Sequence, residues 1–146
     1  MLIPKELRAY FSKDSFLNYP MIDIPQQFSD KRGLILNLAG GRIGDVAFIK
    51  SKKNSIRANH YHINDWHICY LISGEASYYW SNNLLKYEKK EVNKIKVSSG
   101  QMIFTPKQTA HKFVFLKNTE FITIAKQSRK SRFYDKDTIK VVLENF

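Results

Sequence analysis

The sequence predicts an all-β barrel or jelly roll, and two observations lead to this fold class. Short apolar segments recur at short, even spacing, with turn residues such as Ser81-Asn82-Asn83 between them. Within these segments, as in residues 67–72, successive side chains would point to opposite faces of a strand. The chain of 146 residues is long enough for one domain that buries about two-thirds of its unfolded surface.

We expect residues 1–28 to form an N-terminal arm and residues 29–146 to form the barrel with a C-terminal tail. Pro4 favours a short helix over 4–11, and Pro20 and Pro25 favour an extended path over 12–28. The arm has too many apolar residues for a free tail, so it packs on its own barrel or on that of a partner. A two-fold homodimer is the default assembly. The apolar residues are Leu2, Leu7, Tyr10, Phe11, Phe16, Leu17 and Tyr19.

The barrel strands are expected where apolar runs lie between turn residues, and Gly40, Gly41 and Gly44 mark such turns. Residues 84–97 are more polar and predict one or two further strands. Residues 137–143 predict a last strand or a tail. The apolar runs are 33–38, 46–49, 67–72, 75–80, 102–105, 111–116 and 120–125.

All four histidines fall within two short segments, as His60, His62, His67 and His111. His60 and His62 are two residues apart, so on a strand they share a face. Imidazole is the commonest neutral metal ligand, so this concentration predicts one polar cluster at the mouth of an apolar barrel. Apolar residues follow on the same faces, namely Cys69 and Leu71 after His67, and Phe113 and Phe115 after His111.

The two histidine segments resemble the two motifs of the cupin superfamily. The first motif is His-x-His, three or four residues, Glu, six residues and Gly, and it is matched by His60, His62 and Gly74, with His67 at the Glu position. The second motif is Gly, five residues, Pro-x-Gly, two residues, His, three residues and Asn. It is matched by Gly100, Pro106 and His111, with Gln108 and Phe115 replacing its Gly and Asn. The resemblance covers about residues 44–126 and implies a single cupin barrel.

The resemblance implies a divalent metal ion bound by His60, His62, His67 and His111. With four neutral ligands the ion would keep a charge near plus two and attract an anionic ligand. Zn, Fe, Ni, Mn and Cu are the candidates. The alternative is a metal-free histidine cluster that acts in acid-base chemistry.

The net charge of +11 is spread over the chain, with one basic cluster at Lys126, Arg129, Lys130 and Arg132. No nucleic-acid-binding motif accompanies it, so we interpret the charge as solvated lysine or as attraction for an anionic small molecule, and nucleic acid is an unlikely partner. Cys69 is the one cysteine, which excludes an intrachain disulfide and suits a reducing compartment. No signal-peptide core or membrane-spanning segment is evident, so we expect a cytoplasmic protein.

A looser resemblance points to the small cupins of bacterial surface-polysaccharide pathways, which include nucleotide-sugar ketoisomerases and epimerases. They share an Asp-x-Arg-Gly start, matched by Asp30, Arg32 and Gly33, and an Arg-x-x-His-x-His motif, matched from Arg57 to His62. Ketoisomerases of this type use histidine without a metal. Asp30 and Arg32 are equally explained by a turn with a local ion pair.

These resemblances predict removal of a proton beside a sugar carbonyl, with His60 and His62 as catalytic bases and Tyr61 or Tyr78 as a proton donor. Arg57 would bind a diphosphate. Cys69, Phe104 and Phe113 would complete the substrate pocket. Two other functions remain open: a metal-dependent dioxygenase of a small substrate, and a non-enzymatic module that senses a sugar or a metal.

Overall fold

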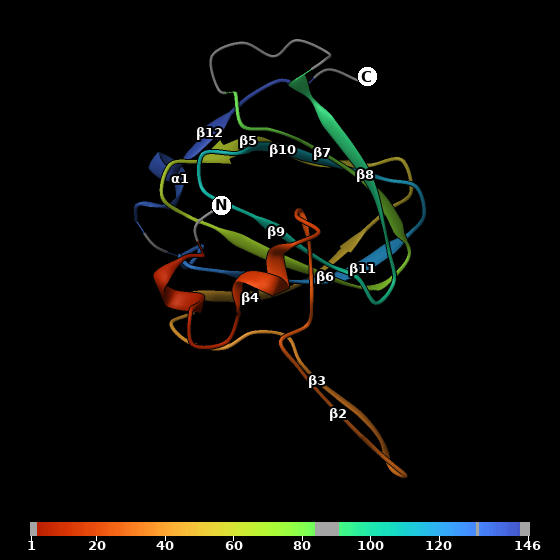
Figure 1. Cartoon of the computed structure of the whole chain (residues 1–146). Coiled ribbons are helices and arrows are strands. Elements are labelled where there is room, and N and C mark those ends of the chain that lie inside the picture. The colour runs from red at the N-terminus through yellow and green to blue at the C-terminus, as the bar shows by residue number, and fades with distance from the viewer. Residues whose placement is uncertain (1–2, 84–90, 131, 144–146) are drawn as a thin grey trace.

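Two five-stranded antiparallel sheets face each other in the computed structural model, which describes residues 3–83, 91–130 and 132–143 (Figure 1). This arrangement confirms the predicted all-β cupin jelly roll. The first sheet has the order β1 (Met21–Ile22), β9 (Met102–Thr105), β6 (His67–Ser73), β11 (Thr119–Ala125) and β4 (Asp45–Ser51). The second has the order β12 (Thr138–Lys140), β5 (Ile56–His62), β10 (Ala110–Phe115), β7 (Glu75–Ser81) and β8 (Asn93–Ser98).

Most strands expected from apolar runs appear within one or two residues of their predicted bounds. Three strands lie outside the predicted runs. β1 and β2 fall in or beside the expected extended arm, and β5 was not predicted because five of its seven residues, from Arg57 to Tyr61, carry little aliphatic character. Of the polar strands expected over 84–97, residues 84–90 lie outside the described residues and 93–98 form β8. Of the last strand or tail expected over 137–143, Asp137 ends a short helix, α1 (Tyr134–Asp137), residues 138–140 form β12, and residues 141–143 continue without regular structure.

The strand predicted over 33–38 forms, but it does not join the barrel. It becomes β3 (Gly33–Asn37), which pairs with β2 (Gln26–Asp30) in a hairpin that projects from the body (Figure 1). At its tip the backbone N–H of Arg32 donates to Asp30 Oδ1 over 2.8 Å, and the two side chains form an ion pair at 2.7 Å. Gly33 adopts a φ of 133°, which favours glycine. The local ion pair therefore belongs to a tight turn.

The N-terminal arm packs on its own barrel, as two 3₁₀ turns, η1 (Lys5–Leu7) and η2 (Lys13–Phe16). Leu7, Phe11 and Phe16 are buried against the outer face of the first sheet. Full burial of each such side chain contributes about 1.5–3 kcal/mol. Because the arm covers this face, β6 is buried on both sides, and Ile68 is as inaccessible as the inward-facing Cys69.

A second apolar cluster fills the space between the two sheets. It combines residues from β6 and β11 with residues from β7 and β10. Stacked aromatic rings run through it, and Phe113 and Phe115 lie 6.0 Å apart at their centroids. Among the described residues, no helix has the length and apolar character needed to cross a membrane. The core thus closes one part of the barrel and leaves the histidine end open for a site.

Candidate functional site

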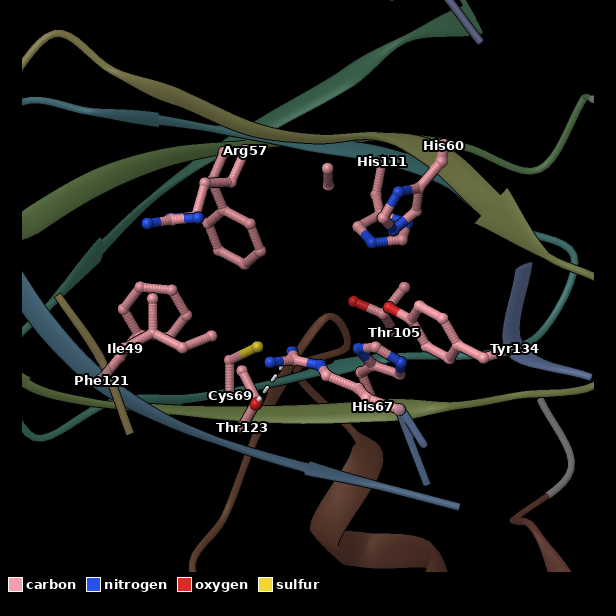
Figure 2. Close-up of a pocket in the computed structure, with 13 residues that line it drawn as sticks. Ile49, Arg57, His60, His67, Cys69, Thr105, His111, Phe121, Thr123 and Tyr134 are labelled. Carbon is pink, nitrogen blue, oxygen red and sulfur yellow. Dashed lines mark hydrogen bonds between the residues drawn. The ribbon is translucent and has the colours of Figure 1, made fainter. Parts of the chain in front are cut away.

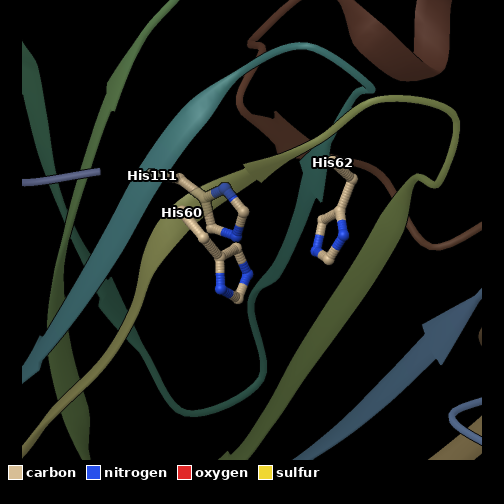
Figure 3. Close-up of side chains that lie close together, drawn as sticks. All are labelled: His60, His62 and His111. Atoms are coloured by element: carbon tan, nitrogen blue, oxygen red, sulfur yellow. The ribbon is translucent and has the colours of Figure 1, made fainter. Parts of the chain in front are cut away.

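The four histidines come from both sheets and meet at one end of the space between them (Figures 2 and 3). His60 and His62 end β5, His67 begins β6 and His111 lies near the start of β10. The ring centroids are 4.6 Å apart for His60 and His62, 4.9 Å for His60 and His111, and 4.4 Å for His62 and His67. Strand pairing sets His60 opposite His111, so the backbone itself brings the two rings together.

A β-bulge directly before His60 sets the direction of the end of β5 that carries His60 and His62. The register passes from His60 opposite His111 to Ala58 opposite Lys112, so Asn59 is the extra residue. Ala58 and Asn59 have φ values of 70° and 58°, a left-handed conformation that costs roughly 1–2 kcal/mol for each non-glycine residue. Bulges and strained backbone of this kind are concentrated at functional sites, where they redirect a side chain.

His62 is oriented by a carboxylate from the C-terminal segment. Its Nδ1 lies 3.6 Å from Asp137 Oδ2 and 3.3 Å from Thr138 Oγ1. The Asp137 carboxylate accepts the backbone N–H groups of Asn64 and Asp65 at 2.7 and 3.2 Å, which fixes its position. This environment favours the tautomer with the proton on Nδ1. The Nε2 atom of His62 is buried and has no hydrogen-bond partner among the described residues, so it presents a free lone pair.

The other two buried histidines are also held through one ring nitrogen. His67 Nε2 lies 2.9 Å from Asp65 Oδ2, and Asp65 in turn accepts the backbone N–H of Gln127 at 3.1 Å. His111 Nδ1 lies 3.0 Å from the carbonyl oxygen of Thr109. A carbonyl only accepts, so Nδ1 of His111 carries the proton and Nε2 offers its lone pair.

Three of these imidazoles are neutral bases at neutral pH. Burial, with repulsion from His67 and Arg129, lowers the pKa of His60 to about 4. Burial, with repulsion from His60, lowers the pKa of His111 to about 3, although the Thr109 carbonyl opposes the shift. Burial and the three neighbouring imidazoles hold the pKa of His62 well below its usual range. All three side chains are therefore unprotonated at neutral pH, and each ring keeps an unshared electron pair on one nitrogen.

A cavity of about 210 Å³ opens beside the histidines (Figure 2). Drug-sized ligands occupy pockets of about 300–1,000 Å³, so this space suits a single small ring rather than a whole nucleotide. Its walls change from imidazole at one end to aromatic and aliphatic side chains at the other. The lining residues are Ile49, Arg57, Ala58, His60, His67, Cys69, Thr105, His111, Phe113, Phe121, Thr123, Arg129 and Tyr134.

Two arginines give the cavity a positive potential. Arg57 is fixed by donating to Ser51 Oγ at 2.6 Å and to the carbonyl of Lys50 at 3.1 Å. Arg129 reaches Thr123 Oγ1 at 3.5 Å, and its charge lowers the pKa of His60. Burial nevertheless raises the pKa of the Cys69 thiol to about 12, so this cysteine is a neutral part of the wall and not a nucleophile.

The structure brings most of the predicted site residues to the cavity. His62 does not line it, but its ring lies 4.6 Å from that of His60. The predicted residues that line the cavity are His60, His67, His111, Arg57, Cys69 and Phe113. Tyr78 is fully buried just beyond the wall, where its hydroxyl bonds to Thr105 Oγ1 at 2.8 Å. Burial raises its pKa well above the usual value, so the phenol stays protonated.

The expected placement of Phe104 and Tyr61 is corrected. Phe104 packs on Phe16 and Trp66 beneath the arm, because Thr105 takes the inward face of β9 and neighbouring residues alternate. Tyr61 lies between His60 and His62 on β5, and the same alternation turns it to the other face.

Several lining residues were not foreseen from the sequence. Thr105 and Thr123 were detectable as inward-facing members of predicted strands. Arg129 was recognised only as part of a basic cluster, and the sequence did not indicate that its side chain would enter the cavity. Tyr134 enters on α1, which only the tertiary structure brings beside His62, at 6.2 Å between ring centroids.

Two facing antiparallel sheets with histidines gathered at one end make this chain a single-barrel cupin in fold. The solved structures that it resembles include several sugar-nucleotide isomerases and epimerases. They include a TDP-quinovose 3,4-ketoisomerase from Campylobacter jejuni, at 17% identity and a TM-score of 0.63, with 79% of this chain and 87% of that chain covered. A dTDP-4-dehydrorhamnose 3,5-epimerase from Sulfolobus tokodaii matches at 17% identity and a TM-score of 0.64, with coverage of 89% and 82%. No protein-family description and no curated protein matches the sequence.

The predicted divalent metal site is wrong. The ketoisomerases and epimerases that share this fold act without a metal ion. The structure also does not bring the four expected histidine ligands into one group. Ring nitrogens of His60, His62 and His111 lie within 4.8 Å of one another, whereas His67 groups with His62 and Asp65. The interpretation of the sequence that is left is a metal-free histidine cluster that acts in acid-base chemistry.

Proposed function

We propose that the protein is an isomerase or epimerase that moves a proton beside the keto group of a nucleotide-linked sugar. The observation that carries the proposal is the set of neutral imidazoles, with the tautomers of His62 and His111 fixed by their neighbours, against a cavity sized for one ring. The fold likeness to sugar-nucleotide ketoisomerases and epimerases supports it. The arginines and the net charge of +11 suit a substrate with a diphosphate.

The first step is transfer of a carbon-bound proton to an imidazole at the cavity wall. His60 and His111, on adjacent strands, are the two bases that we assign, because the third histidine of the cavity wall, His67, is held by Asp65 at 2.9 Å. The electron pair of the broken C–H bond moves onto the carbonyl oxygen and gives an enolate. The ring of His62 lies 4.6 Å from that of His60, and its Nδ1 lies 3.6 Å from Asp137 Oδ2, so positive charge that reaches this ring is stabilised by a fixed carboxylate.

The enolate oxygen needs a fixed positive partner, and Arg129 supplies it. Arg129 lines the same cavity as His60 and His111, and its side chain reaches Thr123 Oγ1 at 3.5 Å. Preorganised donors of this kind are worth roughly 10²–10³ in rate. We assign the diphosphate to Arg57, whose guanidinium is planar and anchored at the cavity wall. Tyr78 lies just beyond the wall, and its protonated hydroxyl is linked to the cavity through Thr105 Oγ1.

The reaction ends when the imidazole returns a proton to carbon. Return to the neighbouring carbon, with a hydroxyl proton moving to the former carbonyl oxygen, shifts the ketone by one position. Return to the opposite face of the same carbon inverts its configuration. Neither outcome consumes an oxidant or any other reactant. The dioxygenase alternative depended on a metal ion and is not retained.

The test is to incubate the purified protein with TDP-4-keto-6-deoxyglucose in excess chelator and to identify the products by NMR. We expect a new keto sugar or a new epimer from the wild-type protein, and at least a 100-fold slower reaction from His111→Asn. Leu17→Ser, an exposed change in the arm, is the matched control and should react normally. Binding of TDP without any turnover would instead identify a non-enzymatic sugar-binding module. A cytoplasmic location and a role in polysaccharide biosynthesis stay predictions.

A further inference from the structure

The cavity has histidines on both of its walls. His60 and His111 belong to β5 and β10 of the second sheet, whereas His67 belongs to β6 of the first sheet. Figure 2 shows His60 and His111 on one side of the cavity and His67 on the other. Facing sheets lie about 10 Å apart. A sugar ring held between them would therefore present one face to His60 and His111 and the opposite face to His67.

His67 is held more firmly than the histidines of the opposite wall. Its Nε2 lies 2.9 Å from Oδ2 of Asp65, which is fully buried. The other carboxylate oxygen, Oδ1, accepts the backbone N–H of Gln127 at 3.1 Å, so the carboxylate is fixed. A carboxylate oxygen only accepts, so Nε2 of His67 donates its proton to Asp65. Nδ1 has no hydrogen bond to any described residue and is the ring nitrogen left for a substrate.

The charges around His67 suit a proton donor. A buried carboxylate in direct contact stabilises the imidazolium form of this ring. Repulsion from His67 also contributes to the lowered pKa values of His60, His62 and His111. The electrostatics therefore divide the cluster. Three rings suit proton acceptors, and His67 suits the group that gives a proton back.

We propose that His67, held by Asp65, is a further catalytic residue that protonates the enolate on the ring face opposite His60 and His111, an assignment that rests on the proposed function. His60 or His111 first takes the carbon-bound proton from its own side. Nδ1 of His67 then gives a proton to carbon from the other side, and the electron pair of the enolate forms the new C–H bond as a carbonyl re-forms. After product release the base loses its proton to water and His67 regains one, so no reactant is consumed.

This arrangement fixes the stereochemistry of the reaction. The new C–H bond lies on the ring face opposite to the one that was broken. At the same carbon this inverts the configuration, and at the neighbouring carbon it sets the configuration of the new hydroxyl-bearing centre. The proton in the product comes from water through His67, because the proton that was removed stays on the other wall.

The experiment separates proton removal from proton return. TDP-4-keto-6-deoxyglucose is incubated with the protein in deuterated buffer, and NMR follows both the exchange beside the carbonyl and the appearance of product. His67→Asn should form product at least 100-fold more slowly, while exchange stays close to the wild-type rate. Asp65→Asn should give the same separation more weakly, because the amide still accepts from Gln127 but has lost the charge. Ile72→Ser, an exposed change on the same strand, is the control and should retain both activities.

The wild-type product gives a second measurement that needs no variant. From the first turnover, the carbon that gains a proton should carry deuterium. Transfer of the proton from the substrate into the product would overturn the assignment of His67. Exchange and product that fall together in a correctly folded His67→Asn, or that both persist, would also overturn it and leave the proposed function standing. A wild type that shows neither exchange nor product would refute the proposed function, and the assignment with it.

Discussion

Lowering the pH from 7 to 5 should destabilise this protein strongly, because its buried histidines resist protonation. Unfolded histidine has a pKa of about 6.5. In the folded chain the pKa values of His60 and His111 are lowered to about 4 and about 3, and that of His62 is lowered as well. At pH values between the folded and the unfolded pKa, the unfolded state binds more protons than the folded state. The free energy of unfolding therefore falls as the pH falls. The stabilising effect is fully present above pH 6.5.

The magnitude follows from the distance between pH 5 and the unfolded pKa. At pH 5 an unfolded histidine is almost fully protonated, while His60 and His111 in the fold remain almost neutral. A difference of 1.5 units corresponds to about 2 kcal/mol for each residue. With His62 the total is about 6 kcal/mol, which is comparable with the whole stability of a typical domain, about 5–15 kcal/mol.

The assay is urea unfolding followed by circular dichroism at pH 7, 6 and 5. We expect the free energy of unfolding to fall by about 6 kcal/mol over this range for the wild type. In His111→Asn the fall should be smaller by about 2 kcal/mol, because one titrating group is gone. Leu17→Ser should follow the wild-type curve. Equal free energies at pH 7 and pH 5 would refute the view that these imidazoles are buried and neutral.

Four further substitutions test individual residues. Asp137→Asn should lower kcat about 100-fold, because His62 loses its carboxylate, and steady-state kinetics at constant fold content measure this. Arg129→Met should lower kcat by about 10²–10³ and leave the affinity for TDP unchanged. Arg57→Met should weaken TDP binding, as measured by calorimetry. Weaker TDP binding in Arg129→Met, with a lower kcat but normal TDP binding in Arg57→Met, would contradict the two assignments. Lys112→Met should lower the free energy of unfolding in urea by about 1–3 kcal/mol, because the buried Nζ donates to the Leu143 carbonyl at 2.6 Å. An unchanged unfolding midpoint would show that this hydrogen bond does not stabilise the fold.

Local patterns in the sequence were sufficient to predict the fold class and the convergence of the histidines. Alternation along a strand is a local property, so the shared inward face of His67 and Cys69, and that of His111 and Phe113, follow from the order of the residues alone. The same rule did not reveal that Phe104 faces the arm, because both faces of β9 are buried and both are apolar.

The remainder of the site depends on contacts that no local pattern encodes. Asp137 and Tyr134 reach the histidines only because β12 pairs with β5 and α1 precedes it. The bulge at Asn59 has no glycine to signal its left-handed backbone. The metal prediction failed for a chemical reason, since imidazoles at cupin motif positions suit a metal ion and an acid-base cluster equally well.

The most direct test of the central claim is solvent exchange at the sugar carbon. TDP-4-keto-6-deoxyglucose is incubated with chelator-treated protein in deuterated buffer, and loss of the proton signal beside the carbonyl is followed by NMR. Neutral histidines acting as bases predict deuterium incorporation at the same rate with and without chelator, and its loss in a variant with His60 and His111 both changed to Asn. No incorporation by the wild type, or incorporation that stops with chelator and returns with added metal, would contradict the account.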